Sequence, residues 1–372
     1  MKIGFVFLNE HEGRGGLENV VLKVVHEFKQ QGFETVAYSL YPFLDNAFFT
    51  HFDQHYIGNI PRFFHHNKAP KPRFLFSVLL RWELKKMLRA AEGCDVVLLM
   101  NLSLLLRKNY DLLLAFKQKS PHTVLLTWFH GSLHSFYKGK KPIAVNIMNC
   151  ADGHLAISSG MVADLANVFG QRNIHLIHNP TDQADTVVRN PRRLIYLGRI
   201  AHVKRVVELV EILAPLQGDW TLDIIGDAAD KVLEARLQAT IAAHQLGSRV
   251  HWHGWQAQPW SCVDEAGVLL LNSKNEGFGL VLVEAMMRGI PCVAADCPTG
   301  PADIVQNEVN GWLYPMDEPQ ACRTIMQEIL DGTRPLPSPE QVQHSVLKFE
   351  TSHFMRNFKQ VLLHEVRKKT QH

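Results

Sequence analysis

Short apolar runs alternate with stretches of helical periodicity along almost the whole chain. The runs at 2–8, 95–101 and 122–130 are rich in Val, Ile and Leu and lack polar alternation. Such runs are typical of strands that are buried on both faces, as in a parallel sheet covered by helices. This alternation predicts an α/β fold built from doubly wound parallel sheets.

A polar stretch with two prolines, residues 179–193, interrupts the alternation. We interpret 181–192 as a linker between an N-terminal domain, residues 1–180, and a C-terminal domain, residues 193–345. Two such halves predict two Rossmann-like domains that face one another across a cleft, with ligand at the carboxyl ends of strands. The last segment, residues 346–372, is expected to be a helix that can pack back on the N-terminal domain.

Composition limits the classes of partner. A chain of 372 residues is long enough for two cores, and its net charge of only +3 does not indicate a nucleic-acid partner. The six cysteines form no C-x-x-C pair, and most lie in apolar surroundings, which favours buried thiols in a reducing compartment. The N-terminus "MKIGFVFLNEHEG" reads as a first strand and not as a signal peptide. No uncharged run approaches the ~18 residues of a membrane span, so we expect a cytoplasmic protein.

A glycine-rich loop, "GRGGLENVV", follows the first predicted strand and opens the first helix. Glycines at a helix N-terminus, here Gly15 and Gly16, make a ready anion site. The dinucleotide fingerprint would need a third glycine where Glu18 stands, and the second strand ends without an acid for a ribose, so NAD is disfavoured. The loop is either a phosphate or substrate loop or only a tight turn.

In the second half, charged and small residues follow successive strands. Arg199 and Lys204 come after "RLIYLG", where two cations beside a helix start suit a diphosphate, although they can also be ordinary surface charges. Gly226 ends the next strand, and His253 and Gly254 end the one after it.

The stretch "EGFGLVLVE" places one carboxylate on each side of a helix start. Gly277 and Gly279 let backbone amides approach a ligand, and a helix from about Leu280 aims its positive end at them. Glu284 lies roughly 6 Å along that helix, at about 1.5 Å per residue, and Glu276 lies before it. A nucleotide sugar carries hydroxyls on both sides of its diphosphate, so this arrangement suits a ribose on one flank and a hexose on the other.

These motifs together resemble a known family. "EGFGLVLVEAM", "GRIAHVK", "GRGGLE" and "GPADIV" are similar to motifs of the GT-B glycosyltransferases of the large retaining family 4, in the expected order and over nearly the whole chain. The strings "HLAISSG", "IIGD", "GWQAQPW" and "CPTGPADIV" look most like the bacterial lipopolysaccharide-core galactosyltransferases that use UDP-galactose. The resemblance implies transfer of a hexose from a UDP-sugar to a hydroxyl of a glycan, either lipopolysaccharide core or another lipid-linked saccharide.

The resemblance also implies roles for the motif residues. Arg199 and Lys204 would neutralise the donor diphosphate as UDP leaves. Glu284 would bind the ribose hydroxyls, and Glu276 would bind the donor sugar. The other implied donor-binding residues are Gly15, Gly16, Gly226, His253, Gly254, Gly277, Phe278, Gly279 and Leu280.

Within that set, the backbone amides of Gly279 and Leu280 would reach phosphate and sugar. Gly15 and Gly16 would approach the phosphate from the other domain, and the loop at 253–254 would lie near the base.

The resemblance implies a retaining mechanism without an obvious nucleophile. The acceptor hydroxyl would attack from the front face, the leaving phosphate would take its proton, and the enzyme would act by positioning and electrostatic stabilisation. No D-x-D triplet occurs, which is consistent with Arg199 and Lys204 replacing a metal ion and with no cofactor. His130 would contact the donor sugar near the reacting centre, although a His at a strand end is often structural. His134 is a candidate on the acceptor side.

Residues 61–90 are basic and aromatic, with eight Lys or Arg against the single acid Glu83. This segment is either an interfacial element that docks on anionic lipid, at the inner face of the cytoplasmic membrane, or a helix of the first domain whose apolar side is core.

Two other function classes remain open from the sequence. One is a nucleotide-sugar epimerase or hydrolase of the GT-B type, and the other is a sugar-nucleotide-binding protein without catalysis. The presence of both glutamates and both cations favours an enzyme over the second class.

Overall fold

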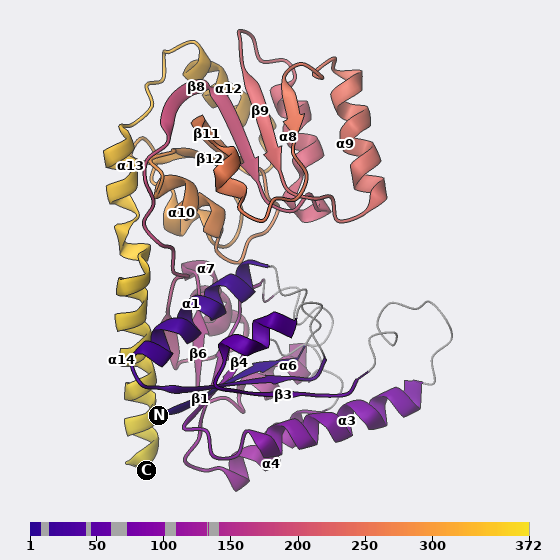
Figure 1. Ribbon diagram of the computed structural model, residues 1–372, viewed down its shortest axis with the longest axis vertical. Helices are drawn as coiled ribbons and strands as arrows, with labels where there is room; N and C mark the ends of the chain where they lie inside the picture. The colour runs from indigo at the N-terminus through magenta and orange to yellow at the C-terminus, as the bar shows by residue number, and fades with distance from the viewer. Residues whose placement is uncertain are drawn as a thin grey trace. The chain divides into compact units, whose positions relative to one another are not determined.

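The computed structural model describes residues 1–8, 15–41, 46–60, 73–100, 109–131, 133 and 141–371, and these form two compact units (Figure 1). Unit 1 comprises Met1–Pro180 and Ser352–His372, and unit 2 comprises Thr181–Thr351. Among the described residues, no helix is both long enough and apolar enough to cross a membrane.

Unit 1 contains a parallel sheet with the order β3-β2-β1-β4-β5-β6-β7. Its strands are β1 Lys2–Phe7, β2 Glu34–Ser39, β3 Gln54–Ile57, β4 Val96–Leu99, β5 Val124–Trp128, β6 Gly153–Ala156 and β7 Ile174–Leu176. Its described helices are α1 Gly16–Gln30, α3 Arg73–Ala90, α4 Tyr110–Lys119, α6 Lys141–Met148, α7 Ser159–Ala163 and α14 Thr351–Thr370. The central strands are buried almost throughout, as predicted for strands covered on both faces.

Unit 2 contains a second parallel sheet with the order β10-β9-β8-β11-β12-β13. Its strands are β8 Val188–Leu197, β9 Thr221–Ile225, β10 Val250–Trp252, β11 Glu265–Leu271, β12 Cys292–Asp296 and β13 Gly311–Pro315. Its helices are α8 Val206–Leu213, α9 Lys231–Ala243, α10 Leu280–Met286, α11 Pro301–Ile304, α12 Pro319–Leu330 and α13 Pro339–Ser345. In each sheet, strand order reverses between neighbours that are not consecutive in sequence, which is the doubly wound pattern.

The predicted linker differs from what the structure contains. Strand β8 begins at Val188, so part of the polar stretch 181–192 is sheet, where Val188 pairs with Glu265 and Arg189 with Ala266. The guanidinium of Arg189 is half-buried and donates to the carbonyl of Pro337 at 3.1 Å. Main-chain pairing does not depend on side-chain polarity, which is why a polar, proline-containing segment extends this strand.

The C-terminal helix α14 (yellow in Figure 1) belongs to unit 1 from Ser352 onwards. It begins at Thr351 instead of 346, because Leu347–Phe349 form a separate 3-10 turn in unit 2. Two phenylalanines of α14 pack on aromatic residues of unit 1. Measured between ring centroids, Phe358 lies 4.9 Å from Trp128 and 5.7 Å from Phe28, and Phe354 lies 6.4 Å from Trp128.

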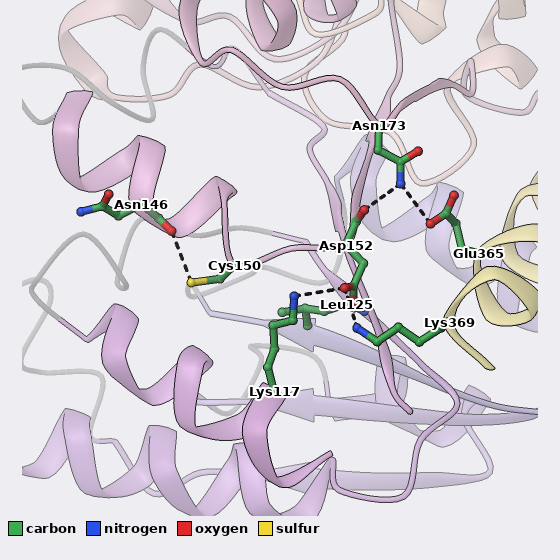
Figure 2. A network of polar contacts seen from close by, with 8 residues as sticks. All are labelled: Lys117, Leu125, Asn146, Cys150, Asp152, Asn173, Glu365 and Lys369. Atoms are coloured by element: carbon green, nitrogen blue, oxygen red, sulfur yellow. Dashed lines mark hydrogen bonds and ion pairs between the residues drawn. The ribbon is translucent and has the colours of Figure 1, made fainter. Parts of the chain in front are cut away.

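Polar contacts attach the end of α14 to the same unit, as Figure 2 shows. Glu365 is 2% exposed and accepts hydrogen bonds from Asn173 Nδ2 at 3.0 Å and from His175 Nε2 at 3.1 Å. Lys369 Nζ lies 2.6 Å from Asp152 Oδ1. A buried carboxylate is stable only when it is paired in this way, so Glu365 fixes where α14 docks.

Candidate donor-binding site

In unit 2, strands β8 and β11 are neighbours at the point where strand order reverses. Ile195 of β8 pairs in parallel register with Leu269 of β11. Arg199 follows the carboxyl end of β8, and Glu276 follows the carboxyl end of β11. Ligands of open α/β sheets bind outside the carboxyl ends of strands at such a switch point. The fold therefore brings two of the predicted site residues to one sheet edge, although 77 positions separate them in the sequence.

The two loops at this edge meet in an ion pair. Lys204 Nζ lies 2.6 Å from Glu276 Oε1, and the two side chains are 27% and 8% exposed. The hydroxyl of Thr299 donates to the backbone carbonyl of Glu276. Among the described residues, the second carboxylate oxygen of Glu276 has no hydrogen-bond partner. Lys204 and Glu276, predicted as separate contacts to phosphate and sugar, are thus a single charged pair.

A second set of contacts holds the lysine loop against the glutamate loop. Arg205 has a left-handed backbone with φ of 48°, and its guanidinium donates to the carbonyl and the side-chain oxygen of Asn272 at 2.9 and 3.1 Å. The Tyr314 hydroxyl donates to the same side-chain oxygen at 2.8 Å. The Lys274 amide donates to the carbonyl of Val203 at 2.8 Å. The ion pair is therefore positioned by buried polar groups behind it.

Arg199 is exposed, and its guanidinium has no partner among the described residues. Its backbone carbonyl accepts a hydrogen bond from the Tyr196 hydroxyl at 3.0 Å. Burial raises the pKa of Tyr196, and the nearby charge of Glu276 raises it further, so Tyr196 remains a neutral donor. The loop is anchored while its cationic side chain is free to meet a ligand.

Helix α10 begins at Leu280, which confirms the predicted helix start. Gly279 caps it with φ of 96°, a conformation that side chains other than glycine rarely adopt. Gly277 and Phe278 form the turn before the cap, and Phe278 is buried. A Cβ at Gly300 would lie 2.2 Å from the carbonyl oxygen of Phe278, so a glycine is needed there for the two loops to approach.

Glu284 lies on α10 and is half-buried. Its Oε2 accepts a hydrogen bond from Trp260 Nε1 at 3.1 Å. Arg288 donates from Nη1 to the backbone carbonyl of Glu284 at 2.9 Å, and its guanidinium carbon lies 4.4 Å from the centroid of the Trp260 ring. The carboxylate predicted to bind ribose is therefore held by the indole of Trp260, on which Arg288 stacks.

The glycines predicted after β9 and β10 are in contact with one another. The Gly226 amide donates to the carbonyl of Gly254 at 2.8 Å, and both have positive φ, 140° and 67°. The ring of His253 is engaged elsewhere, since its Nε2 lies 2.7 Å from Asp223 Oδ1. Arg193 also pairs with Asp223 at 3.3 Å, so the His253 side chain has a structural partner in this unit.

The remaining predicted site residues lie in unit 1. Gly15 caps α1 and Gly16 begins it; a Cβ at Gly15 would lie 2.5 Å from Glu18 Oε2. Glu18 is the third helical residue, the position from which a carboxylate folds back over a helix N-terminus, and it is 5% exposed. The predicted phosphate loop thus already carries a carboxylate, that of Glu18.

His130 follows β5 and is half-buried, with its ring centroid 4.5 Å from that of Trp128.

Two predicted features lie outside the described residues. His134 is one of them, and residues 61–72 of the basic aromatic segment are the other. Within the described ranges, no cluster of three or more His, Cys, Asp and Glu side chains is arranged to hold a metal ion.

The sequence offered little to identify the residues that support the site. Trp260 and Arg288 lie 24 and 4 positions from Glu284, and their types carry no signal at that spacing. Arg205 and Asn272 are separated by 67 positions. Only the left-handed backbone of Arg205 marks it as unusual, and this is visible only in the structure.

Comparison with known proteins identifies the family. Residues 14–185 match the model "Glycosyltransferase Family 4", and residues 180–343 match "Glycosyl transferases group 1". The lipopolysaccharide 1,6-galactosyltransferase of Salmonella typhimurium is 31% identical over 326 residues, which cover 84% of this chain and 85% of that protein. The chain belongs to the family 4 glycosyltransferases of the GT-B fold. The enzyme of the same name from Escherichia coli is 34% identical to this glycosyltransferase over 228 residues, 58% of this chain and 62% of that protein.

Solved structures support the same assignment for this glycosyltransferase. A structure titled "lipopolysaccharide outer core galactosyltransferase WaaB apo form" superposes with a TM-score of 0.79 at 27% identity, over 98% of this chain and 100% of the other. Anabaena Alr3699/HepE in complex with UDP and glucose, at 21% identity and a TM-score of 0.76, shares the fold over 98% of this chain. The predictions of a GT-B fold and of a hexosyltransferase are thereby confirmed.

Proposed function

We propose that this glycosyltransferase transfers a hexose, galactose or glucose, from a UDP-sugar to a hydroxyl of lipopolysaccharide core or another lipid-linked saccharide. Relatives named lipopolysaccharide 1,6-galactosyltransferase support this substrate class. The observation that carries the proposal is the switch point of unit 2, where Arg199 and the pair of Lys204 with Glu276 follow neighbouring strands. Two cations and a carboxylate at that point suit a diphosphate joined to a sugar.

The cations would stabilise the charge that grows on UDP as it leaves. Lys204 has three N–H donors, and its contact with Glu276 engages one of them. The other two are available to phosphate oxygens, and the exposed guanidinium of Arg199 adds a planar fork of donors. We propose that these cations neutralise the diphosphate charge that a metal ion neutralises in other enzymes, so that the reaction needs no metal or cofactor.

Glu276 and Glu284 would bind hydroxyls on different parts of the donor. One carboxylate oxygen of Glu276 accepts a hydrogen bond from Lys204, and the second oxygen is available to a hydroxyl of the hexose. Glu284 lies about one turn into α10, eight positions after Glu276 in the chain, and would take the ribose. The roles of Gly15, Gly16 and His130 stay predictions, because these residues belong to the other unit.

We propose that transfer retains the anomeric configuration. The bond between the anomeric carbon and the phosphate oxygen breaks as the acceptor oxygen bonds to the same face of that carbon, and the leaving phosphate takes the acceptor's proton. Catalysis then rests on positioning and on electrostatic stabilisation of an oxocarbenium-like state. Proton NMR of the product's anomeric coupling tests this, since an inverted linkage would contradict it.

A panel of UDP- and GDP-sugars, each with and without lipopolysaccharide core acceptor, tests the proposed function. We expect turnover with UDP-galactose or UDP-glucose, dependent on acceptor, and none with GDP-sugars. Release or isomerisation of the sugar without acceptor dependence would instead indicate an epimerase or hydrolase. Tight UDP binding without turnover on any acceptor would indicate a binding protein.

A lipid-linked acceptor makes a membrane contact relevant, and we propose that residues 61–90 provide it at the inner face of the cytoplasmic membrane. In the described part, Val78, Trp82, Lys85 and Arg89 are exposed, and their spacing of four, three and four places them on one face of α3. Val78 and Trp82 are 52% and 54% exposed. The acid of this helix, Glu83, is 1% exposed and accepts from the Tyr56 hydroxyl at 3.1 Å.

An apolar and basic face without an exposed acid fits an anionic lipid surface. We expect binding to phosphatidylglycerol vesicles at low salt, weak binding to phosphatidylcholine, and loss of binding in Trp82→Ser and in the double variant Lys85→Glu, Arg89→Glu. Trp255→Ser is the matched control, because Trp255 is 50% exposed but lies in unit 2. Equal binding of all variants would overturn the contact through α3.

A further inference from the structure

The contacts around Glu284 form a closed set of three residues, which we call the Trp260 clamp: Trp260, Glu284 and Arg288. The indole N–H of Trp260 donates to Glu284 Oε2 at 3.1 Å. Arg288 stacks on the Trp260 ring at 4.4 Å and donates to the Glu284 carbonyl at 2.9 Å. Each member therefore contacts the other two, through groups on a short 3-10 turn, Pro259–Cys262, and on and after α10.

The indole is suited to orienting a carboxylate that must bind something else. An indole N–H is a donor only, so it fixes Oε2 and leaves the other carboxylate oxygen to accept from a ligand hydroxyl. Among the described residues, the other oxygen of Glu284 has no hydrogen-bond partner. A glutamate on a helix otherwise samples several rotamers, and fixing it before the ligand arrives lowers the entropy cost of binding.

The position of Arg288 leaves the Glu284 carboxylate available to a ligand. Burial lowers the pKa of Arg288 and the charge of Glu284 opposes that shift, so the two charges lie close together. Arginine commonly meets a carboxylate in a bidentate pair, which would use both oxygens. Here the guanidinium instead rests on the indole and on a backbone carbonyl, and the described contacts include no ion pair between the two side chains.

We infer that Trp260 and Arg288 are positioning residues that hold the Glu284 carboxylate in place for the vicinal hydroxyls of the donor's ribose. This inference rests on the proposed function, which assigns UDP to unit 2. The ligand class follows from the chemistry: a carboxylate with one oxygen already fixed and one free accepts hydrogen bonds from a diol.

The test compares UDP with 2′-deoxy-UDP by isothermal titration calorimetry on the full chain. Trp260→Phe keeps an aromatic ring under Arg288 and removes the N–H. We expect it to weaken UDP binding about 10-fold, the equivalent of ~1.4 kcal/mol and the lower range for a hydrogen bond to a charged group. The same variant should bind 2′-deoxy-UDP nearly as well as the wild type does, and it should cause no further loss in a Glu284→Ala background.

Trp312→Phe is the matched control. Trp312 is a buried tryptophan of the same unit with Arg334 over its ring at 5.6 Å, and its indole N–H has no hydrogen-bond partner among the described residues. We expect Trp312→Phe to leave the ratio of UDP to 2′-deoxy-UDP affinity unchanged. Arg288→Lys serves as a second variant if Trp260→Phe does not fold, with a smaller loss of UDP affinity in the same direction.

The possible outcomes separate the two proposals. Wild-type protein that does not bind UDP would overturn the proposed function and this inference together. Wild-type protein that binds UDP, with Trp260→Phe unchanged or with its effect additive to Glu284→Ala, would overturn only the positioning role. An equal loss of affinity for both nucleotides would indicate a general structural role and would also overturn it.

Discussion

Lys204 Nζ and Glu276 Oε1 lie 2.6 Å apart, and this contact joins the loops that follow β8 and β11. The pair couples a cation suited to phosphate with a carboxylate suited to a sugar hydroxyl. Because Glu276 is 8% exposed, its charge depends on Lys204 for compensation. The structural role of the pair is therefore linked to the catalytic roles that we propose for the two residues.

Lys204→Ala should lower both turnover and stability. It leaves the Glu276 carboxylate buried without its cation, so we expect a loss of about 1–3 kcal/mol in the free energy of unfolding. Turnover should fall about 100-fold, as when one charge-stabilising group is lost from a transition state. Urea denaturation and product formation from UDP-sugar measure the two effects. Unchanged stability would show that the ion pair contributes nothing to the fold.

Arg199→Ala should lower turnover without changing stability. The side chain is exposed and has no partner among the described residues, so the free energy of unfolding should stay within about 0.5 kcal/mol. Loss of one cation at the diphosphate should reduce turnover by about 10-fold or more. Arg236→Ala, an exposed cation on α9, is the control and should retain full activity. Equal activity of the two variants would remove Arg199 from the site.

Substitutions of the two glutamates should affect different properties, UDP binding for Glu284 and sugar transfer for Glu276. Glu284→Ala should weaken UDP binding about 10-fold, because the lost contact is to the nucleotide. Glu276→Ala should leave UDP affinity nearly unchanged while lowering sugar transfer, because the lost contact is to the hexose. Calorimetry with UDP and a transfer assay distinguish them. Equal loss of UDP affinity in both variants would contradict this division.

His154 should make unit 1 less stable at low pH. Burial lowers the pKa of His154 to about 4 from its ordinary 6.5, with a smaller lowering from His175 and an opposing hydrogen bond to Gln171. Its Nδ1 lies 2.8 Å from the Thr127 hydroxyl and its Nε2 lies 3.0 Å from Gln171 Oε1, which suits the neutral ring. The unfolded chain therefore binds a proton near pH 6.5 while the folded chain resists it until about pH 4.

The contribution of His154 to the free energy of unfolding is therefore intact above pH 6.5 and declines as pH falls toward 4. The loss amounts to roughly 3 kcal/mol at 1.36 kcal/mol per pKa unit. Urea denaturation at several pH values measures it. His154→Gln should flatten the slope between these limits, and an identical slope in the variant would show that other groups cause it.

Glu365→Ala should loosen helix α14 from unit 1. The change leaves the Asn173 and His175 side chains without their buried acceptor, which costs about 1–3 kcal/mol for each group left unsatisfied. Hydrogen exchange of the α14 amides should accelerate. Arg356→Ala, on the exposed face of the same helix, should not change it. Unaltered exchange in Glu365→Ala would show that the other contacts of α14 hold the helix without Glu365.

Much of the fold could be predicted from apolar patterning. The Val- and Leu-rich run of β11 is buried on both faces, and this pattern is enough to indicate a parallel strand. The start of α10 at Leu280 was also predictable, because a Gly-Phe-Gly turn precedes the apolar run there. The polar beginning of β8 was not, since Val188 and Arg189 pair through main-chain groups that side-chain character does not reveal.

The sequence by itself determined the alternation of strands and helices and the residue types at the strand ends. Local propensity and burial set these features, and both act over a few neighbouring residues. Only the tertiary structure decided that Lys204 and Glu276 form one ion pair and that Trp260 and Arg288 hold Glu284. Such contacts depend on which strands become neighbours and on where side chains meet across loops, and no spacing along the chain encodes that.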